Sequence, residues 1–210
     1  MTRPIQAVVY DFGGVLFDWN PRHLYRKLFD GDEAGMERFL HEVTTPEWNL
    51  AQDAGRPWDE AVDLLVAAHP AQAELIRAFH LRWEETLAGL IDGSLAVLTE
   101  LKDAGTTLYG LTNWSQETFP VARARYPWLG WFDGIVVSGE EKLVKPDPRL
   151  FQVLIDRYHL DPARLVYIDD SPANVEAAAK LGMDAIHFTD AAKLRAELVR
   201  RELLPAEATR

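Results

Sequence analysis

Two kinds of hydrophobic pattern alternate along this chain. Short apolar runs, typical of buried parallel strands, fall at residues 6–11, 106–112, 134–138, 164–169 and 184–188. Helical patterns follow at residues 93–104, 115–125, 148–158, 172–181 and 190–203. Strands that alternate with helices in this way are joined by right-handed crossovers, which cover both faces of a parallel sheet. The pattern therefore predicts an α/β fold with a doubly wound parallel sheet.

The stretch between the first two strands interrupts this alternation. It has about 70 residues and a helical pattern, which is too long for a connecting loop. Its helical pieces and the residues that separate them are 21–30, 32–42, 57–69 and 71–88, with Gly31, Pro46, Gly55 and Pro70 between them. We expect this stretch to pack as its own unit. The predicted domains are therefore a core of residues 1–19 and 92–210 and a helical domain of residues 20–91.

A carboxylate stands where the first strand meets a double-glycine turn. Asp11 follows three apolar residues and precedes Gly13 and Gly14. Side chains at the carboxyl ends of parallel strands face the crevice in which such sheets bind ligands. Asp11 is therefore a candidate nucleophile for covalent catalysis. An Asp that hydrogen-bonds its own turn would give the same local sequence.

Three later segments carry polar residues at comparable places. Thr112 and Asn113 end the second apolar run. Lys145 precedes a proline in a loop that opens a helix, and Asp169 and Asp170 end a third apolar run. Each has a structural alternative, which is a helix N-cap for the first pair, a solvated loop residue for the lysine, and a cap with a surface neighbour for the acidic pair. Their joint occurrence in this order favours one shared site.

This combination resembles the haloacid dehalogenase-like (HAD) hydrolases. Their motifs are an Asp nucleophile after the first strand, a Ser or Thr after the second, a later Lys, and an acidic cluster after the fourth. The resemblance runs from Val8 to about Phe188 and points to the subgroup of capped sugar-phosphate phosphatases and 2-haloacid dehalogenases. It implies a Rossmann-like core with an inserted helical cap domain, joined by hinges near residues 19–20 and 92–93.

The resemblance also implies an activity. It is that of a phosphatase that hydrolyses a small phosphorylated substrate, with a sugar phosphate as one candidate. Asp11 would attack phosphorus and form a phosphoaspartyl intermediate. Lys145 would pair with Asp11 and the phosphoryl group, while Thr112 and Asn113 would bind the phosphoryl oxygens. The catalytic residues are then Asp11, Thr112 and Lys145.

Mg²⁺ suits this chemistry, because it is a hard cation that binds one or two carboxylates together with substrate phosphate and waters. The expected ligands are the side chains of Asp11 and Asp170 and the carbonyl oxygen of Gly13. Asp169 would be a second ligand or would orient a water molecule. Asn174, four residues beyond Asp170, would orient Asp170 or Lys145, unless it is only an exposed polar residue of a helix.

One position departs from the family pattern. Most phosphatases of this superfamily carry a second Asp two residues after the nucleophile, as general acid toward the leaving group, and here that residue is Gly13. A general acid contributes ~10²–10⁴ in rate. Without another donor, phosphates of good leaving groups should react fastest. Asp18 is the nearest later carboxylate, and we interpret it as a cap on the first helix of the insertion rather than as a replacement acid.

The insertion would set substrate identity. Trp48, Asn49, Arg56 and Trp58 lie around its middle loop, where family members place specificity contacts. A sugar would stack on either tryptophan, and Arg56 would pair with a second anionic group. The alternative, favoured by the general burial of aromatic residues, is that the tryptophans pack within the insertion's own core.

Gly13 leaves two other functions open. A 2-haloacid dehalogenase needs neither metal nor general acid, but the Asp169–Asp170 pair would repel its nucleophile unless a cation lay between them. A degenerate, non-catalytic phosphate-binding protein is the second possibility. Receiver domains use a similar residue set, but their acidic pair precedes the phosphorylated Asp.

The amino-acid composition limits the partners and the cellular compartment that we expect for this protein. With 22 basic and 33 acidic residues the net charge is −11, which argues against nucleic acid as a partner because that needs a basic footprint. The 210 residues include no cysteine, so disulfides and thiolate sites are excluded. No apolar run approaches the ~20 residues of a membrane span, and the first strand begins too early to leave room for a signal peptide. We expect a cytoplasmic monomer or homodimer that binds no membrane.

Overall fold

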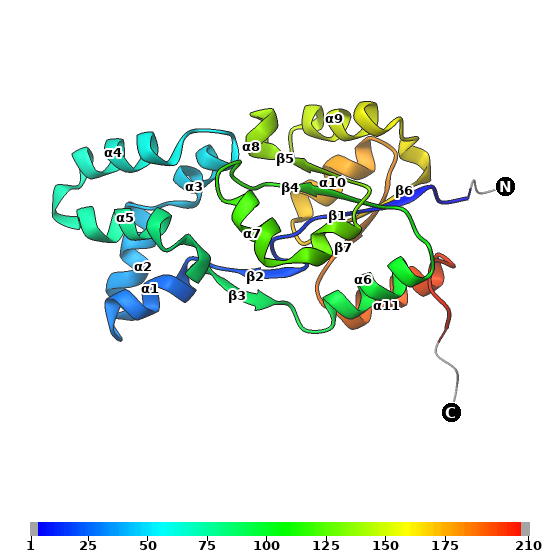
Figure 1. The fold of residues 1–210 in the computed structure, drawn as a ribbon, viewed down its shortest axis with the longest axis horizontal. Coiled ribbons are helices and arrows are strands. Elements are labelled where there is room, and N and C mark those ends of the chain that lie inside the picture. Colours follow the sequence, from blue (N-terminus) through cyan, green and yellow to red (C-terminus); the bar gives the residue numbers. More distant parts are fainter. Residues whose placement is uncertain (1–3, 207–210) are drawn as a thin grey trace.

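Five parallel strands form the central sheet, in the order β5–β4–β1–β6–β7 (Figure 1). The computed structural model describes residues 4–206. The strands of this sheet are β1 (Ala7–Tyr10), β4 (Leu108–Thr112), β5 (Gly134–Val137), β6 (Leu165–Asp169) and β7 (Asp184–His187). They coincide with the five predicted strands to within about two residues. The predicted α/β fold with a parallel sheet is confirmed.

Helices cover both faces of the sheet (Figure 1). One face packs against α6 (Ser94–Asp103) and α11 (Ala191–Arg200), and the other against α9 (Pro148–Tyr158) and α10 (Pro172–Lys180). Successive side chains of a strand point to opposite faces. Val8 and Tyr10 accordingly belong to the first of the two buried clusters, and Val9 to the second. Because both faces are covered, the inner strands are mainly apolar, and the polar residues Thr112 and Asp169 stand at strand ends.

The chain between β1 and β4 leaves the core through an antiparallel ribbon of two short strands, β2 (Phe17–Trp19) and β3 (Leu87–Leu90). Beyond the ribbon lie residues 20–86, which we call the helical insertion and which form the lobe at the left of Figure 1. Its helices are α1 (Arg22–Phe29), α2 (Glu33–Glu42), α3 (Pro46–Asp53), α4 (Trp58–Ala68) and α5 (Ala73–Leu81).

Two predictions about this insertion are wrong. The helix predicted for residues 71–88 ends at Leu81, because residues 83–86 form a 3₁₀ turn and residues 87–90 pair with β2. No helix was predicted between residues 42 and 57, but Pro46 occupies the first turn of α3, where Thr45 Oγ1 accepts a hydrogen bond from Trp48 N at 3.1 Å. Proline is tolerated there because the first N–H groups of a helix have no partner within it.

The remaining helices agree with the prediction to within a few residues. The largest difference is at α7 (Phe119–Arg125), which begins four residues later than expected because residues 116–118 form a turn. A short helix, α8 (Ser138–Glu141), follows β5. Within residues 4–206 no helix has both the length and the apolar character needed to cross a membrane.

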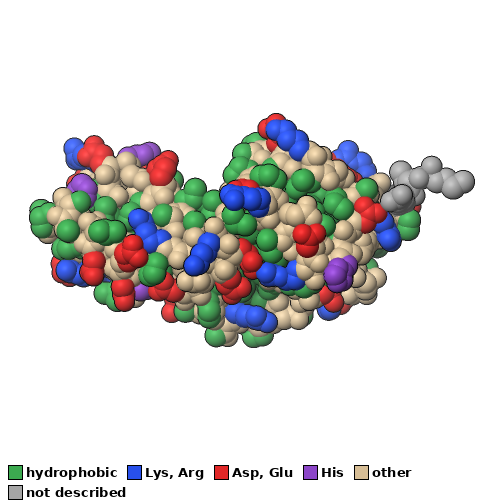
Figure 2. Space-filling view, turned by 90° about the horizontal axis from the view of Figure 1, so that it is seen from above, with side chains coloured by type: hydrophobic (Ala, Val, Ile, Leu, Met, Phe, Trp, Pro, Cys, Tyr) green, Lys and Arg blue, Asp and Glu red, His purple; other side chains and the backbone are tan. Residues whose placement is uncertain are grey.

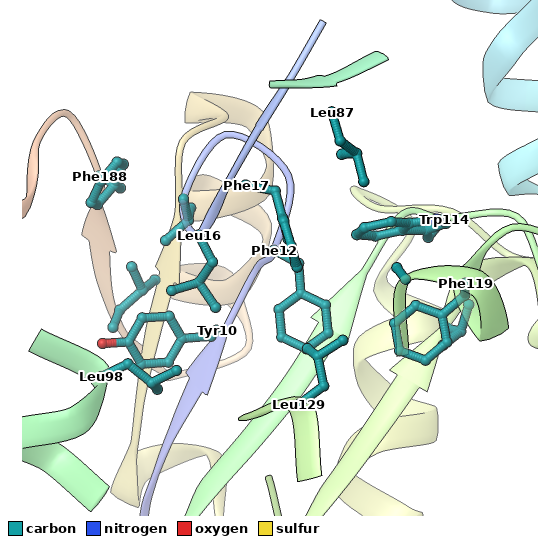
Figure 3. Close-up of a cluster of buried hydrophobic side chains, with 14 of the residues drawn as sticks. Tyr10, Phe12, Leu16, Phe17, Leu87, Leu98, Trp114, Phe119, Leu129 and Phe188 are labelled. Atoms are coloured by element: carbon teal, nitrogen blue, oxygen red, sulfur yellow. The ribbon is translucent and has the colours of Figure 1, made fainter. Parts of the chain in front are cut away.

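Aromatic rings anchor the turn that follows β1 (Figure 3). The ring of Phe12 lies 6.3 Å from that of Phe119 and 5.1 Å from that of Phe132, measured between centroids. Phe17 meets Trp114 edge to face at 5.5 Å. Gly110 of β4 allows Phe12 to approach, because a Cβ at this position would lie 2.5 Å from the Phe12 ring. The turn that carries Asp11 and Gly13 is thereby fixed against the core.

Candidate active site

Three strand ends place the predicted site residues together. β1 lies between β4 and β6, so Asp11, which follows β1, stands between Thr112 and Asp169. The strand register shows that these residues lie at the same level of the sheet, because Tyr10 pairs with Gly110 on one side and with Ile168 on the other. Residues from distant parts of the sequence therefore converge at the carboxyl edge of the sheet, where open α/β sheets bind their ligands.

Lys145 connects the carboxylates at this edge. Its buried Nζ lies 2.8 Å from Asp11 Oδ1 and donates to Asp169 Oδ2 at 2.7 Å and to the carbonyl oxygen of Leu111 at 2.9 Å. Burial opposes the charge on the ammonium, but Asp11 and Asp169 outweigh this effect and raise the pKa of Lys145. The lysine is therefore a fixed cation, not a solvated loop residue, and it contacts the candidate nucleophile directly.

Asp169 is held by donors on both oxygens. Oδ2 accepts from Lys145 and closely from the hydroxyl of Tyr167, and Oδ1 accepts from Ser171 N at 2.8 Å. Asn174 Nδ2 lies 3.0 and 3.1 Å from the two oxygens. Burial would raise the pKa of Asp169, but these partners, with Lys145 the largest, lower it overall. Asp169 is thus an ionised residue that holds Lys145 in position.

The partner predicted for Asn174 is wrong. The residue is buried and contacts Asp169, because the first turn of α10 directs it toward the end of β6 rather than toward Asp170 or Lys145. Tyr167 was not among the predicted residues. It lies two residues before Asp169 on β6, so both side chains point to the same face of the strand, and this spacing is the sequence signal that identifies it.

Asp11, Asp169 and Asp170 form a cluster whose potential ligand atoms all lie within 4.8 Å of one another. Burial raises the pKa of Asp11 to about 7; Lys145 lowers it, and Asp169 and Asp170 raise it. Burial and Asp169 likewise raise the pKa of Asp170. Three carboxylates face one ammonium here, so a further cation fits the charge of the site. The donor set is all oxygen, as Mg²⁺ prefers.

Asp170 packs against the double-glycine turn. A Cβ on Gly14 would lie 2.2 Å from Asp170 Oδ2, and Gly14 has a φ of +74°. Only glycine adopts this conformation readily and leaves room for the carboxylate. The second glycine of the turn therefore serves the approach of Asp170 to Asp11.

The Thr112 hydroxyl is fully buried, and within residues 4–206 it has no hydrogen-bond partner. Leaving a buried polar group unpaired costs about 1–3 kcal/mol. The neighbouring amide of Asn113 is engaged at both ends, since Lys145 N donates to its Oδ1 at 2.8 Å and its Nδ2 donates to the Lys145 carbonyl at 3.1 Å. Neither residue is a helix N-cap. Asn113 fixes the backbone of Lys145, and its predicted contact with substrate stays a prediction.

A pocket of about 70 Å³ lies between the core and the helical insertion. The residues that line it are Gly13, Trp19, Asn113, Trp114 and Thr118, together with Asn49, Asp53, Trp58 and Trp83 of the insertion. Figure 2 shows that the surface is hollowed between the two lobes. Asn49 and Trp58, which the sequence placed near the substrate, both face this pocket.

Trp48 and Arg56 do not line the pocket. Trp48 packs on Trp58 and Phe79, with ring centroids 5.6 and 5.4 Å apart, which matches the alternative of packing within the insertion. Arg56 Nε donates to Gln52 Oε1 at 2.7 Å, and its NH2 group donates to the Trp48 carbonyl at 3.0 Å. These bonds tie Arg56 to α3. The substrate-binding roles of Trp48 and Arg56 stay predictions.

Asp18 is not a helix cap. It lies on β2, half exposed, with its Oδ1 3.0 Å from His23 Nε2. Asn20 instead contacts the first turn of α1, where its Oδ1 accepts a hydrogen bond from Arg22 N at 3.0 Å. The strand pairing of residues 17–19 with β3 delays the helix and explains the difference. Asp18 is also outside the lining of the pocket.

The sequence is similar to a family of known hydrolases. The model of the haloacid dehalogenase-like hydrolases matches residues 5–182, which span the strand ends, the lysine and the acidic pair. This chain belongs to the haloacid dehalogenase-like hydrolase family. The predicted resemblance is confirmed, and with it the assignment of the chain as a HAD hydrolase.

Several relatives of this HAD hydrolase are phosphatases. The sesquiterpene phosphatase astK of Aspergillus oryzae is 27% identical over 192 residues, which cover 90% of this chain and 93% of that protein. A phosphorylated carbohydrates phosphatase of Thermotoga maritima is 24% identical over 191 residues, covering 87% and 84%. The chain is therefore a phosphatase-like member of its family.

Solved HAD structures share the fold. The magnesium complex of a HAD family enzyme from Bacteroides thetaiotaomicron superposes with a TM-score of 0.71 and 20% identity, covering 94% of this chain and all of that chain. The L-2-haloacid dehalogenase of Xanthobacter autotrophicus gives a TM-score of 0.62 and 18% identity, covering 96% and 85%. At these identities the likeness describes the fold alone.

Proposed function

We propose that this protein is a Mg²⁺-dependent phosphatase that hydrolyses a small phosphorylated metabolite through a phosphoaspartyl intermediate on Asp11. The observation that carries the proposal is the buried hydroxyl of Thr112 at the strand end next to Asp11, which has no hydrogen-bond partner among residues 4–206. A hydroxyl donor and an ammonium next to a carboxylate nucleophile match the oxygens of a phosphoryl group. Bound phosphate would satisfy the hydroxyl that otherwise lacks a partner.

Charge supports the metal requirement. In their fully ionised state Asp11, Asp169 and Asp170 carry two more negative charges than Lys145 neutralises, before any substrate dianion arrives. Asp11, Asp170 and the carbonyl of Gly13 would hold Mg²⁺, because the oxygens of Asp169 already accept several hydrogen bonds. When bound, the ion would neutralise phosphoryl oxygens and so permit an anion to approach phosphorus. The Bacteroides HAD enzyme has also been solved with magnesium and inorganic phosphate.

In the proposed reaction an Asp11 oxygen attacks phosphorus, and the bond from phosphorus to the leaving oxygen breaks. Lys145 contacts both the nucleophile and the phosphoryl group, and Thr112 donates to a phosphoryl oxygen. Water then attacks the phosphoaspartate and releases inorganic phosphate. Asp169 takes no part in bond making and keeps Lys145 in place through its Nζ contact.

The helical insertion would act as a cap over this site and would contact the leaving group. Its pocket contains the indole rings of Trp19, Trp58, Trp83 and Trp114. Flat apolar rings bind the face of a sugar as well as a hydrocarbon chain. The relatives named above act on a sesquiterpene and on phosphorylated carbohydrates, so both classes belong in the substrate search.

The test is release of phosphate from a mixed panel of phosphate esters, with Mg²⁺ and with excess chelator, next to release of halide from 2-chloropropionate. We expect phosphate release that requires Mg²⁺ and no halide release. Halide release in chelator would identify a dehalogenase. Phosphate binding without turnover, seen by calorimetry, would identify a non-catalytic phosphate-binding protein. The Asp11→Asn protein, purified in parallel, controls for contaminating phosphatases.

A further inference from the structure

The structure leaves an open space where most phosphatases of this family would carry an acid. A Cβ on Gly13 would meet no atom within 4 Å. Gly13 lines the pocket between the two lobes, to which the helical insertion contributes Asn49, Asp53, Trp58 and Trp83. Asp53 is the one carboxylic acid among the residues that line this pocket within the described part of the chain. A carboxylic acid thus lines the same pocket as the position from which the core's own acid is missing.

The surroundings of Asp53 suit a proton donor. The residue is only partly exposed, and Asn49 Nδ2 donates to its Oδ2 at 3.2 Å. Burial raises the pKa of Asp53 to about 7, while the backbone of Ser115 lowers it. The carboxyl group therefore exchanges its proton near neutral pH, as a general acid–base requires. Asp18, in contrast, is half exposed and pairs with His23 on the ribbon.

Hydrogen bonds fix the end of α3 to the core. Ser138 Oγ donates to the carbonyl oxygen of Asp53 at 2.5 Å, and the same Oγ accepts from Trp114 N at 2.9 Å. Two residues later the chain touches α8, where a Cβ on Gly55 would lie 2.7 Å from the carbonyl of Gly139. The backbone of Asp53 and that of Gly55 therefore contact the residues that follow β4 and β5.

We propose that Asp53 supplies, from the helical insertion, the general acid–base that the core lacks at Gly13. This inference rests on the proposed phosphatase function. In the first step the Asp53 carboxyl donates its proton to the ester oxygen as that oxygen leaves phosphorus and Asp11 bonds to it, so the alcohol departs neutral. In the second step the Asp53 carboxylate takes a proton from the attacking water. The new P–O bond then displaces Asp11, phosphate leaves, and Asp53 is again protonated.

The role predicts a pH profile. Because the first step needs protonated Asp53, kcat/KM for a poor leaving group should fall as the pH rises above about 7. The other titratable or charged groups on the elements around Asp53 include Glu47, Arg56, His80, Glu117, Glu140, Glu141 and Lys142. Within the described chain none of them contributes to the pKa shift of Asp53, which comes from desolvation and the Ser115 backbone.

The test compares Asp53→Asn with Asp63→Asn, a matched control on an exposed position of α4. Each protein is assayed with p-nitrophenyl phosphate, whose leaving group needs no proton, and with ethyl phosphate, whose leaving group does. We expect Asp53→Asn to lose ~10²–10⁴ of kcat/KM on ethyl phosphate, to lose little on p-nitrophenyl phosphate, and to lose the alkaline limb of the profile. The Asp63→Asn protein should match the wild type on both esters.

Adding Gly13→Asp to Asp53→Asn should restore hydrolysis of ethyl phosphate, because the added side chain enters open space. An equal loss on both esters, or wild-type activity of Asp53→Asn on ethyl phosphate, would overturn the assignment. If the wild-type protein hydrolysed neither ester in Mg²⁺, the phosphatase function itself would fail. Circular dichroism of each variant confirms that the fold is retained.

Discussion

At the scale of single residues, the two glycines after Asp11 differ in what they require. Gly14 has a φ of +74°, and a Cβ on it would lie 2.2 Å from Asp170 Oδ2. Gly13 has an ordinary backbone conformation and open space beside it. The sequence alone shows only a double-glycine turn. The structure shows that only Gly14 is needed for its backbone, so the missing acid at Gly13 is not imposed by the turn.

We predict opposite outcomes for the two alanine variants. Gly14→Ala should lower the free energy of unfolding by about 1–2 kcal/mol and disturb Asp170, because alanine is strained at positive φ. Gly13→Ala should change it by no more than about 0.5 kcal/mol. Urea unfolding of the two variants measures the difference. Equal destabilisation would show that the turn tolerates neither substitution.

Thr112 allows stability and function to be separated. Thr112→Val removes a buried hydroxyl that has no partner in the described structure, so the variant should be as stable as the wild type or more stable. Its kcat/KM for phosphate esters should fall about 10²-fold, as when one oxyanion donor is lost. Ser94→Ala is the control, since the Ser94 hydroxyl is also buried and unpartnered there but lies outside the cluster. A Thr112→Val protein that is both destabilised and fully active would contradict the proposed role.

At the scale of elements, the alternating pattern of the core was sufficient to predict every strand of its sheet. Parallel strands buried on both faces are continuous apolar runs that can be recognised locally. The β2–β3 ribbon could not be predicted in this way. Its strands, Phe17–Trp19 and Leu87–Leu90, are short and pair across the whole insertion, so their stability depends on contacts far apart in sequence. Residues 82–88 were assigned to a helix for the same reason.

The ends of β1 and β6 carry the predicted metal site, which gives a prediction at this scale. Asp170→Ala should abolish activity at Mg²⁺ concentrations that saturate the wild type, or shift the requirement to much higher concentrations, since few protein ligands remain. Activity is measured over a Mg²⁺ titration. Glu176→Gln, on the exposed side of α10, is the matched control and should titrate like the wild type. An unchanged titration of Asp170→Ala would place the ion elsewhere.

At the scale of the whole molecule, the docking of the insertion on the core determines which of its residues reach the pocket, and this could not be predicted from the sequence. Trp58 Nε1 donates to Ser115 Oγ at 3.1 Å, and Trp58 N donates to Glu117 Oε1 at 3.0 Å. Asp53 approaches the pocket through the same docked surface. No motif marks Asp53, because it lies at the end of a short helix and becomes important only through its surroundings. The strand-end residues were predictable since the topology itself brings them together.

The raised pKa of Asp53 predicts a stability effect with a definite sign. In the native state the Asp53 carboxyl group keeps its proton up to about pH 7, whereas in the unfolded chain it loses that proton near pH 4. Native stability therefore decreases as pH rises through this window, relative to a variant that does not titrate. Asp53→Asn should be close to the wild type in stability near pH 4 and about 4 kcal/mol more stable at pH 8.

Urea unfolding at the two pH values measures this difference, and Asp63→Asn should show none. An Asp53→Asn protein that is less stable than the wild type at pH 8 would show that Asp53 is ionised in the native state. An ionised Asp53 would have no proton to donate in the proposed first step.

Trapping of the phosphoryl group on Asp11 tests the proposed mechanism most directly. The protein is mixed with a phosphate ester and Mg²⁺, quenched in acid within the first turnover, and digested for mass spectrometry. We predict a phosphoryl adduct on Asp11 that is absent in chelator and absent from Asp11→Asn, which should also lose about 10⁴-fold or more in turnover. Asp18→Asn, on the exposed ribbon, should carry the adduct like the wild type. Phosphate released in the first turnover without any adduct, or wild-type turnover by Asp11→Asn, would contradict the account.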